Sequence, residues 1–436
     1  MVFAINMILL TADQCMLFLI NLMVARNAGP AAFGDFTVAV NSLFLIGTIV
    51  TMGLDSIVAH YIPKYYVKKK HDEIHSLILS IKNFLQPIYL TLFIGGFLLS
   101  LAIIALSYAL EHLRLYEMSH LVTLFLWGAV VLSIYNIYMQ LFRAVGYMRT
   151  AIFLNMLQTL FYFLFTLFTY FYFYDVLFHN NAQYFAHIML ISFILSYVLI
   201  GFAFILVHQK TQLNLRITLD KLRKNDIAWK KKISGYTIQN LDKYAFTVTP
   251  LLITEWLGKD EYIVGLFSAV ASIIALGFTT LSPINILIKP EISAAFAHGK
   301  EFLLRTLFKY VGICLGIACI VALTLGIFSE RILLLFKSDF IEVLPFVYIA
   351  LINLFCYSIS MPLTLVIQYS REGSKIGAQF TLYILLVQII ASLILISWLD
   401  LLGTMICYVG INIIYVIAAS IIAYRVYQRE PFGHHE

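Results

Sequence analysis

Carboxylates stand inside two apolar segments of this 436-residue chain, and a glycine follows each of them sixteen residues later. Asp13 precedes Gly29 in the first half, and Asp242 precedes Gly258 in the second half, at an offset of 229 residues. Lys243 adds a cation directly after Asp242. Charged groups are costly to place in an apolar helix, so those that are present usually face a path for a substrate or an ion. These residues predict a charged, hydrogen-bonding site in the interior.

Polar side chains accompany these charges at helical spacing. They recur at sevens and eights in the first apolar segment, and at threes and fours around residue 240, which places them along one face of each helix. Amides and hydroxyls in such helices often only hydrogen-bond to a neighbouring helix, and that interpretation stays open for each single residue. The candidate lining of a substrate or ion cavity is Asp13, Asn21, Asn41, Gln239, Asp242, Lys243 and Thr247.

Four further charged residues lie near the ends of apolar segments, namely Asp55, Lys82, Arg143 and Arg371. They are candidates for the mouth or gate of the cavity. Other roles stay open, because Asp55 can pair with a basic neighbour such as Lys64, and Lys82 can extend its ammonium group to water. The two arginines can form a hinge between lobes or anchor helix ends.

The sequence has no residue spacing typical of a metal site or of a disulfide framework. The five cysteines all fall in apolar segments without a C-x-x-C pair, and the eleven histidines are scattered. We therefore expect no metal site and no bound cofactor.

The elements that must position these residues are membrane helices. Apolar residues make up 61% of the chain and charged residues 12%, against roughly 25% charged in a soluble domain. The apolar residues form about twelve segments, most of them long enough to cross a bilayer of about 30 Å. The predicted spans are 4–25, 36–59, 77–106, 119–141, 151–174, 184–207, 233–256, 262–288, 306–328, 345–368, 376–397 and 401–424.

The basic residues predict the orientation of these spans. Loops that are cytoplasmic when both termini are inside, together with the tail, carry 21 of the 29 lysines and arginines, and the opposite loops carry five. This bias explains the net charge of +6 without any nucleic acid partner. We predict an N-terminal lobe over 1–207, a basic cytoplasmic linker over 208–232, a C-terminal lobe over 233–424 and a cytoplasmic tail over 425–436.

The two halves of the chain repeat one another. Besides the Asp-to-Gly spacing, the pattern Gln-x-x-Arg that ends at Arg143 recurs at Arg371, at an offset of 228 residues. Six spans per half insert both halves from the same side, which relates them by an axis along the membrane normal. The expected fold is therefore all-α, with about twelve transmembrane helices in two six-helix lobes that form a V around a cleft. Duplicated halves in a membrane protein indicate a transporter.

Several short runs carry a family resemblance. The run VARNAGPAAFGDF from Val24 to Phe36, the run MGLDS from Met52 to Ser56, and the second copy LGKDEY with GLF from Leu257 to Phe267 resemble the polysaccharide transporter family that includes O-antigen flippases. That family belongs to the superfamily of multidrug, oligosaccharidyl-lipid and polysaccharide (MOP) exporters. The resemblance implies a MATE-like pair of lobes that moves polyprenyl-diphosphate-linked oligosaccharide from the cytoplasmic to the outer leaflet by alternating access.

The resemblance also implies partners and a location. These are a lipid-linked oligosaccharide, membrane lipids, polysaccharide assembly proteins and the bacterial inner membrane. A cation-coupled multidrug or small-molecule exporter of the same superfamily is the second candidate, with Asp13 binding a coupling proton or sodium ion. A membrane-embedded glycosyl polymerase or ligase has less support, because the longest outward loop, around 329–344, has no histidine and no paired catalytic carboxylates appear. We expect a protein that is not an enzyme.

Overall fold

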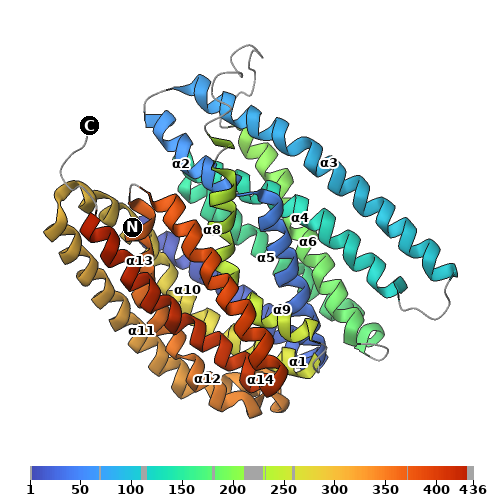
Figure 1. Cartoon of the computed structure of the whole chain (residues 1–436). Helices are drawn as coiled ribbons and strands as arrows, with labels where there is room; N and C mark the ends of the chain where they lie inside the picture. Colours follow the sequence, from blue (N-terminus) through green and yellow to red (C-terminus); the bar gives the residue numbers. More distant parts are fainter. Residues whose placement is uncertain are drawn as a thin grey trace. The chain divides into compact units, whose positions relative to one another are not determined.

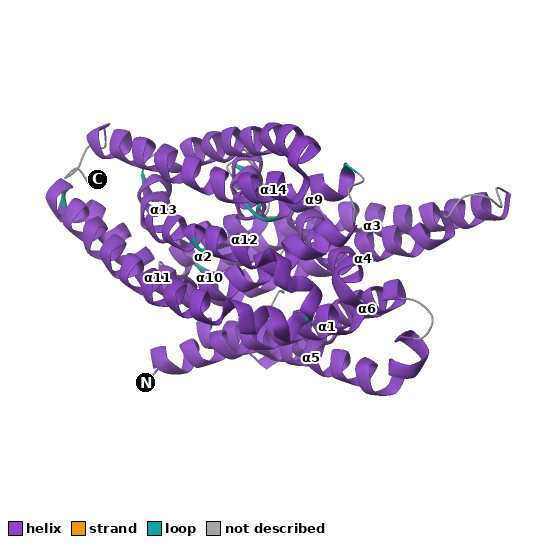
Figure 2. Ribbon diagram, turned by 90° about the horizontal axis from the view of Figure 1, so that it is seen from below, coloured by secondary structure: helices purple, strands orange, loops and turns teal. Residues whose placement is uncertain are grey.

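The computed structural model describes residues 2–67, 70–109, 115–178, 182–210, 229–230, 232–257, 261–370 and 372–429. Within these ranges every regular element is a helix and no strand is present (Figure 2). The predicted all-α fold is confirmed, and each predicted span falls on one described helix or on two consecutive ones.

The helices are labelled in chain order in Figure 1. Their bounds are α1 (Val2–Thr51), α2 (Leu54–Val67), α3 (His71–Ala109), α4 (Leu115–Ala144), α5 (Met148–Phe178), α6 (Ala182–Lys210), α8 (Ile233–Ala245), α9 (Val248–Trp256), α10 (Glu261–His298), α11 (Lys300–Phe336), the short 3-10 helix η2 (Ser338–Val343), α12 (Leu344–Ala350), α13 (Ile352–Tyr369) and α14 (Gly373–Arg429).

Two of these helices each contain two predicted spans. The apolar stretches of α1 and α14 are 41 and 55 residues long, whereas one crossing needs about 20 residues. The helical path is interrupted in α1 at Gly29, with φ 82° and ψ 177°, and in α14 at Asp400, with φ 48° and ψ −122°. Gly29 and Asp400 therefore mark the turns between consecutive spans.

Three spans that the sequence predicts as continuous are broken, at residues 52–53, 246–247 and 351, and those predictions are wrong in this respect. The predicted span 36–59 is interrupted at Met52 and Gly53, which have φ values of 53° and 67°. The predicted span 233–256 is interrupted between α8 and α9, at residues 246–247. Pro250 explains the second break, because its ring clashes with the carbonyl group four residues earlier and it offers no N–H to that group.

The described helices have the surface of a multi-pass membrane protein. Eight helical stretches in the described part are long and apolar enough to cross a membrane, by length and composition. One stripe of α11 is buried, whereas Ile320 and Ile327 on the same helix are 66% and 73% exposed. Exposed apolar side chains of this size along a whole helix fit contact with lipid.

The chain divides into two compact units. Unit 1 comprises residues 1–38, 166–189 and 242–436, and unit 2 comprises residues 39–165 and 190–241. In unit 1, α10, α11, α13 and α14 pack around a core that includes Ile288 and Tyr415. In unit 2, α2 packs against α3 and α4 around Leu54 and Ile81. The lobe boundaries drawn from the sequence, 1–207 and 233–424, stay a prediction.

Candidate functional site

Asp13 is the central charged residue of the candidate site. It lies in α1 of unit 1, and 3% of its surface is exposed. Gln14 Nε2 donates a hydrogen bond to Asp13 Oδ2 over 3.2 Å. Gln14 Oε1 accepts a hydrogen bond from Oγ1 of Thr279, in α10, over 3.1 Å. We call these three residues the Asp13 chain.

The Asp13 chain holds a carboxyl group where apolar side chains dominate. The Thr279 hydroxyl also lies 2.9 Å from the carbonyl oxygen of Ala275, so its single hydrogen is shared between two acceptors. A buried carboxylate is stabilised by donors such as the Gln14 amide and is otherwise disfavoured by desolvation. A group of this kind can take up a proton or a small cation and release it when the surrounding hydrogen bonds rearrange.

The remaining predicted cavity residues lie in both units. Asn21 in α1 and Thr247, at the break between α8 and α9, are half-buried in unit 1. Asn41 and Gln239 are half-buried in unit 2. The side chains of Asp242 and Lys243, in α8, lie outside the described residues. Of the predicted lining, the structure therefore places Asp13 in a described polar chain, together with Gln14 and Thr279.

Asp55, a predicted gate residue, has an amide as its partner. Asn240 Nδ2 donates to Asp55 Oδ1 over 2.8 Å, and Ser56 Oγ donates to Asn240 Oδ1 over 3.1 Å. The three residues join the first turn of α2 to α8 within unit 2. A β-carbon on Gly53 would lie 2.6 Å from the Thr237 backbone nitrogen, so this crossing of α2 and α8 requires glycine. Sequence reasoning missed Asn240, which stands next to the polar stripe that contains Gln239.

The other predicted mouth residues differ in their positions, and Lys82 lies about three turns inside α3 rather than at its end. Lys82 in α3 and Arg143, one residue before the end of α4, are exposed. Arg371 lies outside the described residues, just after α13. The roles of Arg143 and Arg371 stay predictions.

The glycines of the repeated motif allow α1 and α10 to pack closely. The contact lies near the start of the predicted spans 36–59 and 262–288. Gly34 in α1 and Gly265 in α10 both stand in unit 1, and a β-carbon on Gly34 would lie 2.8 Å from the Gly265 nitrogen. A β-carbon on Gly265 would collide with the carbonyl group of Pro30. Small residues allow this close approach of two helix backbones. Gly258, the repeat partner of Gly29, lies outside the described residues.

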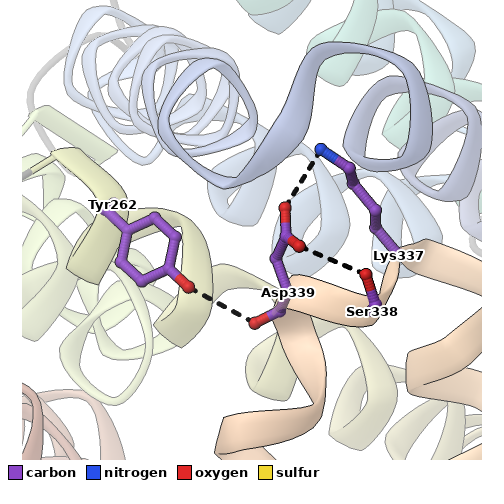
Figure 3. Close-up of polar contacts among 4 residues, drawn as sticks. All are labelled: Tyr262, Lys337, Ser338 and Asp339. Carbon is purple, nitrogen blue, oxygen red and sulfur yellow. Dashed lines mark hydrogen bonds and ion pairs between the residues drawn. The ribbon is translucent and has the colours of Figure 1, made fainter.

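Aromatic and polar contacts surround this glycine crossing. The ring of Phe33 packs edge-on against Phe336 and Phe340, with centroids 6.0 and 6.2 Å apart. Figure 3 shows the polar contacts of the same region, where Tyr262 OH donates to the Asp339 carbonyl oxygen over 3.4 Å and Lys337 pairs with Asp339 over 3.0 Å. The exposed ion pair stabilises little by itself. The buried rings and glycines hold α1, α10 and η2 together.

One buried amide, that of Gln388, was not predicted from the sequence. Gln388 in α14 is 0% exposed, and its Oε1 and Nε2 atoms have no hydrogen-bond partner in the described part of the chain. Buried amides are normally satisfied by protein, ordered water or a ligand. The only sequence signal is an amide in the middle of an apolar run. Among the described residues, no group of three or more His, Cys, Asp or Glu side chains could hold a metal ion.

Solved transporter structures share this arrangement over nearly the whole chain. An outward-facing multidrug resistance MATE family transporter of the MOP superfamily matches with a TM-score of 0.65 and 17% sequence identity, over 97% of this chain and 94% of the solved chain. An inward-facing conformation of such a transporter matches with a TM-score of 0.67 and 14% identity, over 95% and 94%. This fold is that of MOP-superfamily transporters.

A further MOP superfamily transporter has the same fold. It comes from Pyrococcus furiosus, is described as having a binding pocket of reverse polarity, and matches with a TM-score of 0.66 and 16% identity, over 98% of this chain and 95% of that one. No protein-family model and no curated protein sequence matches the chain. These structural neighbours are transporters rather than enzymes, and they support a multi-pass membrane transporter fold for this chain.

Proposed function

We propose that this chain is a flippase of the MOP superfamily, which moves polyprenyl-diphosphate-linked oligosaccharide from the cytoplasmic to the outer leaflet by alternating access. In this proposal it works in the bacterial inner membrane, with both termini in the cytoplasm, and serves surface polysaccharide assembly. Its partners are the lipid-linked oligosaccharide, membrane lipids and polysaccharide assembly proteins. It binds no nucleic acid and is not an enzyme.

The observation that best supports a transport function is the Asp13 chain, the hydrogen-bonded residues Asp13, Gln14 and Thr279. Burial of a carboxyl group that is 3% exposed in an apolar helix costs free energy. Its hydrogen-bonded connection to Thr279, through Gln14, couples α1 to α10. Any change in the position of these two helices alters the hydrogen bonds around Asp13. A coupling proton or sodium ion at Asp13 can therefore bias one arrangement of the helices over another.

The choice of cargo depends on the sequence resemblance. The GPAAFGDF run of the polysaccharide branch, residues 29–36, lies at the interruption of α1, and its Gly34 makes the crossing with Gly265. Amides and hydroxyls of the predicted cavity suit a sugar, and Lys243 suits a diphosphate. Lys82 in α3 and Arg143 and Arg371 near helix ends supply further cations.

A second candidate function is cation-coupled export of drugs or other small molecules. It is favoured by the position of Asp13 in the first span and by the similarity to MATE transporters. In that case Asp13 binds the coupling ion and the cargo is soluble or amphipathic rather than lipid-linked.

Reconstitution into proteoliposomes separates the two candidates. A fluorescent polyprenyl-diphosphate oligosaccharide is placed in one leaflet, and its exposure in the other leaflet is followed with and without proton and sodium gradients. A cationic dye is measured in parallel. The flippase proposal expects movement of the lipid-linked sugar, and Asp13→Asn is expected to remove the dependence on the gradient. Transport of the dye with no movement of the lipid-linked sugar would establish the second candidate instead.

A further inference from the structure

A hollow in unit 2 lies between α2, the start of α3 and the residue pair before α8. It is a small hollow that opens partly to solvent. Three aromatic side chains, one carboxylate and two hydroxyls line it, from Tyr61, Tyr65, Trp229, Glu73, Ser76 and Ser80. We call it the α2–α3 hollow.

Helical spacing explains how these side chains meet. Glu73, Ser76 and Ser80 recur at threes and fours, so they share one face of α3. Tyr61 and Tyr65 are one turn apart on α2. Opposite them Trp229 is 3% exposed, because its ring also packs edge-on against Phe84, one turn beyond Ser80, at 5.9 Å.

The charges around the hollow have both signs. Lys232 Nζ lies 5.4 Å from the centre of the Tyr61 ring, and Lys230 Nζ lies 5.6 Å from the centre of the Trp229 ring. Glu73 supplies a carboxylate in the lining, and burial together with the charge of Glu73 raises the pKa of Tyr65. The chain's own ammonium groups already lie over the faces of two rings. A cationic ligand would have to displace them, whereas an anionic group would be attracted to them.

The hollow stands where a lipid headgroup would be. Its residues up to Ser76 fall in the connection between the predicted spans 36–59 and 77–106. Ser80 falls in the first turn of the span 77–106, and Trp229 precedes the predicted span 233–256. The basic residues predict that both connections are cytoplasmic. Tyrosine and tryptophan are typical of this depth as membrane anchors, but a carboxylate and two serines among them add the hydrogen-bonding groups of a binding site.

We propose that the α2–α3 hollow binds the sugar diphosphate headgroup of a lipid-linked glycan in the cytoplasmic leaflet. The sugar ring lies against Tyr65, Glu73 accepts hydrogen bonds from its hydroxyls, Ser76 and Ser80 accept or donate further ones, and Lys230 and Lys232 bind the diphosphate at the rim. This inference rests on the proposed flippase function and adds a reception site for the cargo that is separate from the Asp13 chain.

Binding of a soluble headgroup analogue to the purified full-length protein tests the site. The probe is geranyl-diphosphate N-acetylglucosamine in detergent solution, compared with inorganic diphosphate and with free N-acetylglucosamine, and affinity is measured by calorimetry. Glu73→Gln and Lys232→Gln are each expected to weaken binding of the full probe by about tenfold or more. Glu73→Gln should not weaken diphosphate binding, because it removes a like charge, and Lys232→Gln should leave binding of the free sugar unchanged.

A matched control separates a site from general charge. Lys300 Nζ lies 5.7 Å from the centre of the Tyr427 ring, in unit 1, so Lys300→Gln removes a comparable lysine over a ring elsewhere. Its affinity for the probe should equal that of the wild type. Unchanged affinity in both hollow variants, or an equal loss in Lys300→Gln, would overturn the inference. Failure of the flippase function is recognised separately, as wild-type protein that binds the probe at the hollow and moves no lipid-linked sugar in proteoliposomes.

Discussion

A β-carbon placed on Gly34 would lie 2.8 Å from the backbone nitrogen of Gly265, so neither glycine can acquire a side chain without moving a helix. The two residues stand in equivalent runs of the repeat, Gly-Asp-Phe in the first half and Gly-Leu-Phe in the second. The duplicated motif thus packs against its own copy. This explains why a glycine stands at both positions.

Gly265→Ala should destabilise the protein. The new methyl group would meet the carbonyl group of Pro30, and overpacking of this kind costs about 1–3 kcal/mol. The midpoint of thermal unfolding in detergent, followed by intrinsic fluorescence, measures the effect. Gly316→Ala in α11 is the control, because nothing lies within 4 Å of the added methyl group, and it should be neutral or stabilising by up to about 1 kcal/mol. Equal midpoints for the two variants would contradict the close crossing.

Thr279→Val should impair transport more than stability. Valine keeps the shape of threonine but removes the hydroxyl that donates to Gln14, and a neutral hydrogen bond contributes only about 0.5–1.5 kcal/mol to folding. The gradient-driven rate in proteoliposomes is expected to fall severalfold, because the Asp13 chain loses its connection to α10. Thr280→Val, on the neighbouring exposed position of α10, is the control. Equal rates in the two variants would mean that the Gln14 contact is only structural.

Asn240→Ala should be more destabilising than Ser56→Ala. Asn240 donates to the Asp55 carboxylate and also accepts from Ser56, and a hydrogen bond to a charged group contributes about 1.5–3 kcal/mol against about 0.5–1.5 for a neutral one. Removing Ser56 Oγ leaves the Asp55 contact in place. Unfolding midpoints of the two single variants and of the double variant give the coupling between them. A midpoint for Ser56→Ala at or below that of Asn240→Ala would reverse the assignment of the stronger bond.

Lys243→Ala should abolish transport while expression and membrane insertion stay near normal. Lys243 is the one cation that the sequence places deep in a predicted span, so a diphosphate cargo depends on it, and Lys243→Arg should keep part of the activity because the charge survives while the geometry changes. If Lys243 instead only neutralises Asp13, the double variant Asp13→Asn with Lys243→Gln should recover the activity that each single change loses. Full activity in Lys243→Ala would dispose of both roles.

Gln388→Met should leave the unfolding midpoint unchanged or raise it. Methionine has a similar length, and the change removes a buried amide that has no partner among the described residues. Transport is the second measurement. If the amide serves a bound water or ion during the cycle, the rate falls although stability does not. A clear loss of stability would show that Gln388 has a strong partner in the folded protein.

The sequence by itself determined the helical class and the succession of spans. Apolar length and composition are local properties, so they located the apolar helical segments, and the interruption of α1 at Gly29 falls in the predicted gap between the spans 4–25 and 36–59. Asp13 was also found from sequence alone, because a carboxylate in an apolar run is conspicuous without knowledge of any neighbour. The similarity to solved MOP-superfamily transporters shows that the fold is the one expected from the sequence.

Only the tertiary structure decided which polar residues meet. Asn240 lies 185 residues from Asp55 in sequence, and no local pattern distinguishes it from Gln239 beside it. The interruption at Met52 and Gly53 was missed for the same reason, since the hydropathy of 36–59 is continuous and the need for glycine arises from the backbone of α8. The α2–α3 hollow likewise combines α2, α3 and Trp229, which only long-range packing brings together. Hydropathy reports the solvent that each residue faces, whereas a site is defined by contacts between residues far apart in the chain.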